Sequence, residues 1–199
     1  GIASAITVGV ISVTTLGVGW YMAHWWNREV ILYARGFSYR QGSTTAYIQF
    51  ADVKTIRQRA ERRSYFGGVI RRTIYKVTIT TQYDEIIVLD NLYNKMNDLS
   101  ERLEIAITNT LQPFVNARIE ADGVAHFGEI IALTTDGLRA NGDDLHWHEF
   151  GGFTVQDGAL HLKRRDESVW VSVPLEQVEN IRLLLQSIRE KKADGANQT

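Results

Sequence analysis

The sequence predicts a mainly β (α+β) protein, with an N-terminal transmembrane helix before two small units, each a curled antiparallel sheet capped by a C-terminal helix. An uncharged run opens the chain, and short strand-like segments separated by Gly and Asp turns follow in each half. Each half then ends in apolar residues spaced by three and four, as on one face of a helix. We expect a transmembrane helix at 1–27, units at 28–113 and 114–192, and a disordered tail at 193–199.

The first 26 residues contain no Asp, Glu, Lys or Arg. A helix of that length would measure about 39 Å, which exceeds the roughly 30 Å of a bilayer hydrocarbon core. The bulky end of the run, WYMAHWW, argues against a cleaved signal peptide. Its length argues against a buried element of a soluble core. We interpret this segment as a single membrane span.

The flanks of this span predict its orientation and contacts. Basic residues follow it closely and none precedes it, so the positive-inside bias predicts a single-pass protein of the inner (cytoplasmic) membrane with cytoplasmic C-terminal units. Small residues suit packing against other membrane helices, and aromatic residues suit the membrane interface. The predicted packing residues are Gly9, Gly17 and Gly19, and the predicted interfacial residues are Trp20, Tyr21, Trp25, Trp26 and Arg28.

His24 lies in the span beside the aromatic residues. It suits an interfacial side chain, a hydrogen-bond donor to a neighbouring helix, or an axial ligand of a haem or chlorin. A single His among tryptophans is most often interfacial, so no cofactor is expected. A pigment- or haem-associated subunit, for example of a photosynthetic complex, is kept as an alternative.

The first unit is predicted from short segments rich in aromatic and β-branched residues, namely EVILYA, GFSYR and TAYIQF, followed by TIYKVTITT and EIIVLD. TIYKVTITT alternates between apolar and polar positions, which is typical of a half-buried strand. From Leu92 to Leu111 the apolar residues recur at helical spacing, and Pro113 is expected to end that helix.

The second half repeats this order. Strand candidates such as AHFGEIIALT, LHWHEF, ALHLK and VWVSV precede a helical stripe from Leu175 to Ile188. FADVKTI at 50–56 corresponds to WHEFGGF at 147–153. We therefore expect two similar units of about 80 residues each.

Strands followed by a capping helix, with an aromatic-acidic-apolar turn after the third strand, resemble the pleckstrin-homology-like (PH-like) superfold, here in tandem. The segments GFSYRQ…FADV and HFGEIIALTTDGL…LHWHEF resemble uncharacterised bacterial membrane-anchored proteins of this architecture, over residues 29–192. The resemblance implies lipid or protein binding. The lipid-binding members use basic residues of the first hairpin, which here carries only Arg35 and Arg40.

Residues 57–76, RQRAERRSYFGGVIRRTIYK, hold six Arg, one Lys and one Glu in a chain of net charge −1. This pattern predicts a hairpin whose apolar tip projects from a basic collar. Such a tip suits docking onto anionic lipid head groups or an acidic, apolar groove of a partner. A charged hairpin that protects a sheet edge from aggregation is the purely structural alternative. The predicted docking residues are Arg59, Arg62, Arg63, Tyr65, Phe66, Val69, Ile70, Arg71, Arg72 and Lys76.

No catalytic set is evident. The chain has no Cys, which excludes thiolate metal sites and a Cys nucleophile. His146, His148 and Glu149 suit surface residues around a core tryptophan better than zinc ligands, which must number three or four and converge. We therefore expect no enzyme and no metal. The balanced charge disfavours nucleic acid as a partner.

These observations predict a non-catalytic accessory or scaffolding subunit of a larger integral membrane complex, whose cytoplasmic units dock on neighbouring subunits. Its expected partners are the lipid bilayer, other integral membrane subunits and anionic lipid head groups. An independent membrane-anchored lipid-binding module is the alternative.

Overall fold

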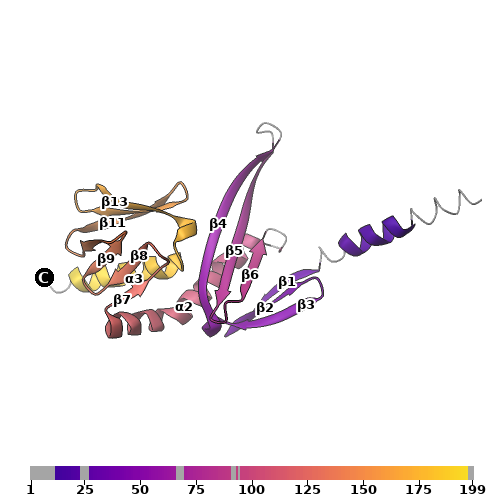
Figure 1. The fold of residues 1–199 in the computed structure, drawn as a ribbon, viewed down its shortest axis with the longest axis horizontal. Coiled ribbons are helices and arrows are strands. Elements are labelled where there is room, and N and C mark those ends of the chain that lie inside the picture. Colours follow the sequence, from indigo (N-terminus) through magenta and orange to yellow (C-terminus); the bar gives the residue numbers. More distant parts are fainter. Residues whose placement is uncertain (1–11, 23–26, 66–69, 91–92, 94, 197–199) are drawn as a thin grey trace, which may run out of the picture.

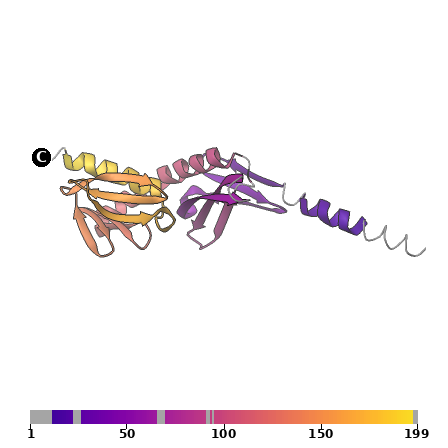
Figure 2. The ribbon, with the colours of Figure 1, turned by 90° about the horizontal axis from the view of Figure 1, so that it is seen from above.

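The computed structural model describes residues 12–22, 27–65, 70–90, 93 and 95–196. In that part of the chain the fold is mainly β, with four small antiparallel sheets and three helices (Figure 1). Each half contains two of the sheets and ends in a helix, and Figure 2 shows the two halves side by side along the long axis.

The first half contains two three-stranded sheets, each a simple up-and-down arrangement with neighbours in sequence paired. One sheet consists of β1 (Arg28–Leu32), β2 (Gly36–Gln41) and β3 (Thr44–Gln49). A short 3-10 turn, η1 (Phe50–Asp52), leads to the other, which consists of β4 (Val53–Tyr65), β5 (Ile70–Thr81) and β6 (Ile86–Asp90). The alternation of TIYKVTITT correctly places Val77 and Ile79 in the core, where both are buried.

The second half contains a four-stranded and a three-stranded sheet. The first of these consists of β7 (Val124–His126), β8 (Ile131–Thr134), β9 (Gly137–Ala140) and β10 (Asp143–His146). The second consists of β11 (Phe150–Gln156), β12 (Ala159–Arg164) and β13 (Val169–Pro174). The 3-10 turn η3 (Leu175–Gln177) then leads to α3 (Ile181–Ala196), which ends within the segment predicted as a tail.

One long helix, α2 (Met96–Asp122), belongs to both hydrophobic cores. Leu103 and Ile107 are buried in the core of the first half, and Ile119 is buried in that of the second. Leu111 lies between them and packs against both. The helix therefore joins the two halves without a flexible linker.

The helix continues through Pro113, where the sequence predicted its end. Proline removes one backbone donor and leaves the carbonyl four residues earlier, that of Asn109, without its helical partner. Both residues are exposed, so water can satisfy that carbonyl. The helix ends instead at Gly123, whose left-handed φ of 73° and N–H bond to the Ile119 carbonyl (3.0 Å) form a C-cap.

The same pattern of backbone hydrogen bonds occurs within each half. The N–H of Phe50 donates to the carbonyl of Arg35 at 3.0 Å, and the N–H of Trp147 donates to that of Asp136 at 3.0 Å. In each half the acceptor directly precedes a strand, β2 or β9. Corresponding 2.8 Å bonds run from Gln82 to Asp52 and from Arg165 to Glu149. Phe50 and Trp147 therefore hold equivalent places, as the alignment of FADVKTI with WHEFGGF predicts.

The structure contradicts the predicted transmembrane helix. No helix in the described part of the chain is long and apolar enough to cross a membrane. The described N-terminal helix covers only residues 12–22, about 16 Å of helix against a core of about 30 Å. The rest of the predicted span, 1–11 and 23–26, lies outside the described residues. The fold class is therefore wrong in its first element, and a single-pass inner-membrane protein with cytoplasmic C-terminal units is not supported.

Asn180 clamps the second half onto the outer edge of β4. Its side-chain oxygen accepts from the N–H of Ile56 at 2.9 Å, and its side-chain nitrogen donates to the carbonyl of Lys54 at 3.2 Å. Its own N–H donates to the carbonyl of Ile56 at 3.0 Å. Asn180 has a left-handed φ of 51°, a conformation that Asn tolerates better than most residues. It therefore serves this edge as a neighbouring strand would.

We predict that Asn180→Gly loosens this junction. Glycine keeps the left-handed backbone but leaves the Ile56 N–H without its partner, which costs about 1–3 kcal/mol. Hydrogen exchange should accelerate at the Ile56 amide more than at amides of β12, which pair within their own sheet. Asn180→Ala should lower the free energy of unfolding further, because alanine adds strain at positive φ. Unchanged exchange at Ile56 would show that the side chain is dispensable.

Glu104 provides a second link between the halves. It accepts from the Arg182 Nε at 3.4 Å across α2 and α3, and its side chain is 12% exposed. Burial raises the pKa of the Glu104 carboxyl, and the nearby Arg182 charge opposes that rise. The folded state therefore holds the proton of Glu104 to higher pH than the unfolded state does.

This pKa shift predicts a pH-dependent effect of Glu104→Gln. Stability from a raised carboxyl pKa is present below the unfolded value and is lost as pH rises through the folded value. The glutamine variant lacks this loss, so its free energy of unfolding should rise relative to the parent from about pH 4 towards neutrality. Urea denaturation across that range measures the difference. Glu101→Gln is the control, because Glu101 is 67% exposed and 3.8 Å from the same arginine. A difference that falls with pH would refute this assignment.

Candidate functional site

The β4–β5 hairpin projects beyond the sheet that holds its base. The two strands pair from Val53 and Thr81 to Tyr65 and Ile70, whereas β6 pairs with β5 only over 76–80. Beyond that point the hairpin has only two strands, and Figure 1 shows it extending away from both halves. We call residues 60–75 the basic ribbon.

The predicted docking residues fall mostly in this ribbon. Phe66 and Val69 lie outside the described residues. For six further docking residues the structure describes the strand backbone but not the side chain. These are Arg62, Arg63, Tyr65, Ile70, Arg71 and Arg72. Lys76 is exposed at the base. The backbone thus places these residues in one projecting element, as a hairpin requires.

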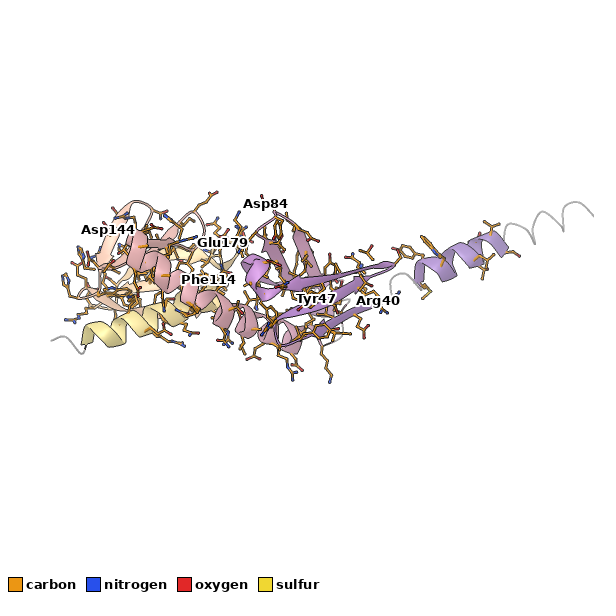
Figure 3. All side chains as sticks on the ribbon, turned by 90° about the horizontal axis from the view of Figure 1, so that it is seen from below. Arg40, Tyr47, Asp84, Phe114, Asp144 and Glu179 are labelled. Carbon is orange, nitrogen blue, oxygen red and sulfur yellow. The ribbon has the colours of Figure 1, made fainter. Side chains whose placement is uncertain are left out.

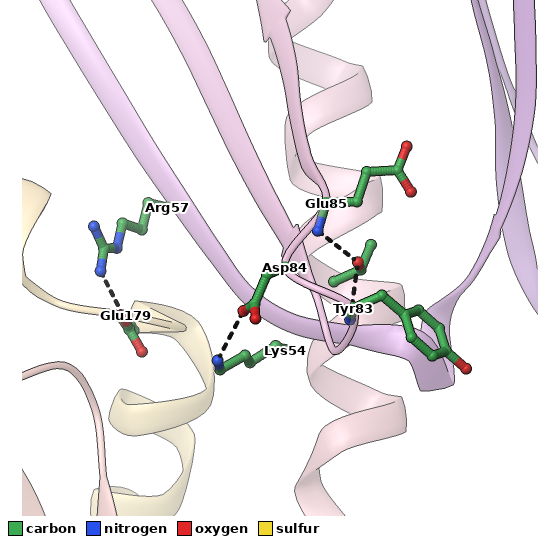
Figure 4. Close-up of polar contacts among 7 residues, drawn as sticks. Lys54, Arg57, Tyr83, Asp84, Glu85 and Glu179 are labelled. Carbon is green, nitrogen blue, oxygen red and sulfur yellow. Dashed lines mark hydrogen bonds and ion pairs between the residues drawn. The ribbon is translucent and has the colours of Figure 1, made fainter.

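The base of the ribbon is paired to the second half. Arg57 forms an ion pair with Glu179 (Figure 4). Arg59 Nε lies 3.6 Å from a carboxylate oxygen of Glu176. Figure 3 shows Glu179 at the junction of the halves. Arg59, predicted to contact a partner, therefore has a carboxylate partner within the chain. Exposed pairs of this kind contribute at most about 1 kcal/mol.

The structure describes only some of the residues predicted to pack in or line a membrane. Trp20 and Tyr21 lie on the 12–22 helix and are 72% and 54% exposed. A Cβ at Gly17 or Gly19 would meet no atom within 4 Å. Arg28 lies 3.5 Å from Asp90 with its charge 5.7 Å from the centre of the Tyr93 ring, so it joins β1 to the end of β6. Gly9, His24, Trp25 and Trp26 lie outside the described residues.

A groove in the second half was missed by sequence reasoning. It has a volume of about 1090 Å³ and lies where β10, β11, β12 and the end of α3 meet. Its basic residues are Lys163, Arg164, Arg165, Lys191 and Lys192, its carboxylates are Asp136 and Glu167, and its aromatic residues are Trp147, Phe150 and Phe153. The runs KRR at 163–165 and KK at 191–192 were the available signal, but they are far apart in sequence.

Several contacts hold the groove wall in place. Trp147 Nε1 donates to the carbonyl of Thr135 at 3.0 Å, and its ring meets that of Phe150 edge-on at 5.9 Å. Lys192 Nζ donates to the carbonyl of Gly151 at 2.9 Å and lies 5.4 Å from the centre of the Phe150 ring. The end of α3 is therefore tied to the start of β11.

A profile of a family of unknown function, DUF6585, matches residues 2–196. The chain belongs to DUF6585. No significant match is found among curated proteins or solved structures. Membership of DUF6585 carries no information on PH-like domains, bacterial origin, scaffolding or lipid binding, so those expectations stay predictions.

The DUF6585 chain shows no candidate metal centre in its described residues, where no three His, Asp or Glu side chains converge. His146 and His148 stack with ring centres 5.5 Å apart at the mouth of the groove. Beside the groove, the Ser168 hydroxyl and N–H donate to Asp166 and, with the charge of Arg164, hold the pKa of that carboxyl below its usual value. The described site is thus a set of cations, aromatic rings and carboxylates, which suits binding.

Proposed function

We propose that this DUF6585 protein is a non-catalytic docking protein that binds an acidic protein surface through its basic ribbon. The projection of the ribbon as an isolated pair of strands carries the proposal. Residues 60–75 contain four Arg and one Glu, a net charge of +3, whereas the whole chain has −1. The remainder of the chain therefore has a net charge of −4, and the positive charge is concentrated on the element that projects furthest.

The purely structural alternative explains only part of the ribbon. Basic residues on an uncovered strand discourage pairing with another chain, which accounts for the arginines. They do not account for Tyr65, Phe66, Val69 and Ile70, four large apolar or aromatic residues in the sequence that joins β4 to β5. Two strands alone bury little surface and are marginally stable in water. A partner with a small apolar pocket in an acidic surface would bury these four side chains.

The base of the ribbon is fixed, which favours docking. Asn180 bonds to the edge of β4, and the Arg57–Glu179 pair lies one residue further along it. These contacts hold the emerging strands against the second half. A binding element held in place before binding loses less conformational entropy when it docks.

A photo-crosslinking residue at Ser64 tests the proposal in cells that make the protein. We expect a crosslink to a specific protein, lost when Arg62, Arg63, Arg71 and Arg72 are all changed to Gln. Arg102→Gln with Arg118→Gln, two exposed arginines of α2, is the control and should leave the crosslink intact. Crosslinks to phospholipid alone would favour lipid binding instead. No crosslink above background would contradict a docking role for the ribbon.

The four-glutamine variant should also bind with a weaker dependence on salt. Attraction between exposed charges is screened over about 8 Å at physiological ionic strength, so the parent should lose affinity as salt rises. The variant should have lower affinity at low salt and approach the parent at high salt. Titration of the crosslinked partner at several salt concentrations measures this. Equal affinity of parent and variant at low salt would reduce the arginines to a solubility device.

Phe66→Ser with Ile70→Ser separates the apolar contribution. Burying two such side chains contributes about 1.5–3 kcal/mol each, so binding should weaken by at least tenfold while its salt dependence stays that of the parent. Circular dichroism should show that both variants keep the β-rich fold. If the serine variant unfolds, these two residues belong to the fold and not to a docking surface.

A further inference from the structure

The groove in the second half has a concentration of positive charge that the chain does not neutralise. Five cations line it against two carboxylates, a balance of +3, with Asp166 just outside. Lys163, Arg164, Arg165 and Lys191 form no ion pair with a carboxylate in the described part of the chain. A cleft lined by one sign of charge concentrates ligands of the other. The groove is therefore suited to an anion.

The equivalent place in the first half carries an ion pair between its own residues. β4 and β11 each contain a bulge one residue after their start, at Lys54 and at Gly151. Asp84 and Glu167 hold equivalent turn positions, with φ of 60° and 64° and the same 3.0 Å bond from N–H to the carbonyl three residues earlier. In the first half Lys54 Nζ lies 3.3 Å from Asp84 (Figure 4).

In the second half this pair cannot form, because Gly151 has no side chain. A Cβ at Gly151 would lie 2.1 Å from the carbonyl oxygen of Arg164, so the backbone excludes any larger residue there. Gly152 follows, and neither glycine fills the space above β11. The two equivalent surfaces thus differ because of one residue. The first half has an ion pair between Lys54 and Asp84, whereas the second half has Gly151 there and an excess of basic side chains.

The groove also offers flat apolar surface beside the cations. Trp147 and Phe153 are partly exposed, and both are braced, Trp147 by its bond to Thr135 and Phe153 by the Arg189 guanidinium 5.4 Å from its ring centre. Arginine and lysine bind phosphate oxygens, and aromatic faces stack on planar rings. The volume of about 1090 Å³ slightly exceeds that of typical small-molecule sites, about 300–1,000 Å³, so a ligand of nucleotide size would fill part of it.

From this combination we infer that the groove binds a nucleotide-like ligand, with its phosphate groups on Arg164, Arg165 and Lys191 and its planar ring against Phe153. The site is separate from the basic ribbon and independent of the proposed docking role.

Isothermal titration of the full chain with ATP tests this inference. We expect ATP to bind more tightly than tripolyphosphate, which lacks the ring, and more tightly than adenosine, which lacks the phosphates. Arg164→Gln with Arg165→Gln should weaken ATP binding about 10–100-fold, as expected for lost hydrogen bonds to charged groups. Arg102→Gln with Arg118→Gln makes the same change in net charge on α2 and should bind ATP as the parent does.

Phe153→Leu tests the ring contact without changing charge. It should weaken ATP binding and leave the affinity for tripolyphosphate unchanged, while amide spectra show an intact fold. Three results would overturn the inference: no binding of ATP, equal affinities for ATP and tripolyphosphate, or loss of ATP binding in Arg71→Gln with Arg72→Gln, which would assign the anion to the ribbon.

Discussion

The shared helix α2 is the constraint on which the remaining arrangement depends. Its first turns fill the core of the first half and its last turns fill that of the second, so neither half can move without disturbing a packed helix. The position of α2 also determines which residues of the two halves meet elsewhere. Asn180 meets the edge of β4, and Arg182 meets Glu104, only because α2 fixes the separation of the two cores. The base of the ribbon and the groove consequently belong to halves that share one packed helix.

The two halves show how equivalent backbones can acquire different surfaces. The matching hydrogen bonds in the two halves show that Phe50 is equivalent to Trp147 and that Asp84 is equivalent to Glu167. At the bulge, however, Lys54 of the first half forms an ion pair with Asp84, whereas Gly151 of the second half has no side chain to pair with Glu167. Equivalent strands also differ in length. β4 and β5 extend into the ribbon, whereas β11 and β12 end in a short turn at Asp157 and Gly158.

Local patterns in the sequence predicted the strands better than they predicted the ends of helices or the groove. Alternation in TIYKVTITT is a property of one strand, and burial of Val77 and Ile79 follows from it directly. Pro113 predicts the end of a helix because proline has no N–H to donate, but here the carbonyl of Asn109 that loses its partner is exposed to water. The transmembrane helix was predicted from the composition of the N-terminal run, and the described helix there is too short to span a bilayer. The groove joins segments around residues 136, 147, 164 and 192, which no local pattern connects.

The two positive regions differ in what their surroundings can do to a bound anion. The backbone of the ribbon projects as two strands beyond the sheet at its base, and contacts that its arginines make with a partner should weaken as salt rises. The groove places its cations beside Trp147, Phe150 and Phe153, so an anion bound there meets aromatic side chains as well as charge. A broad, salt-sensitive surface suits an extended partner, whereas a walled groove suits a small ligand held by few groups. The two regions can thus serve one protein without competing for the same ligand, because their shape and solvation select different ones.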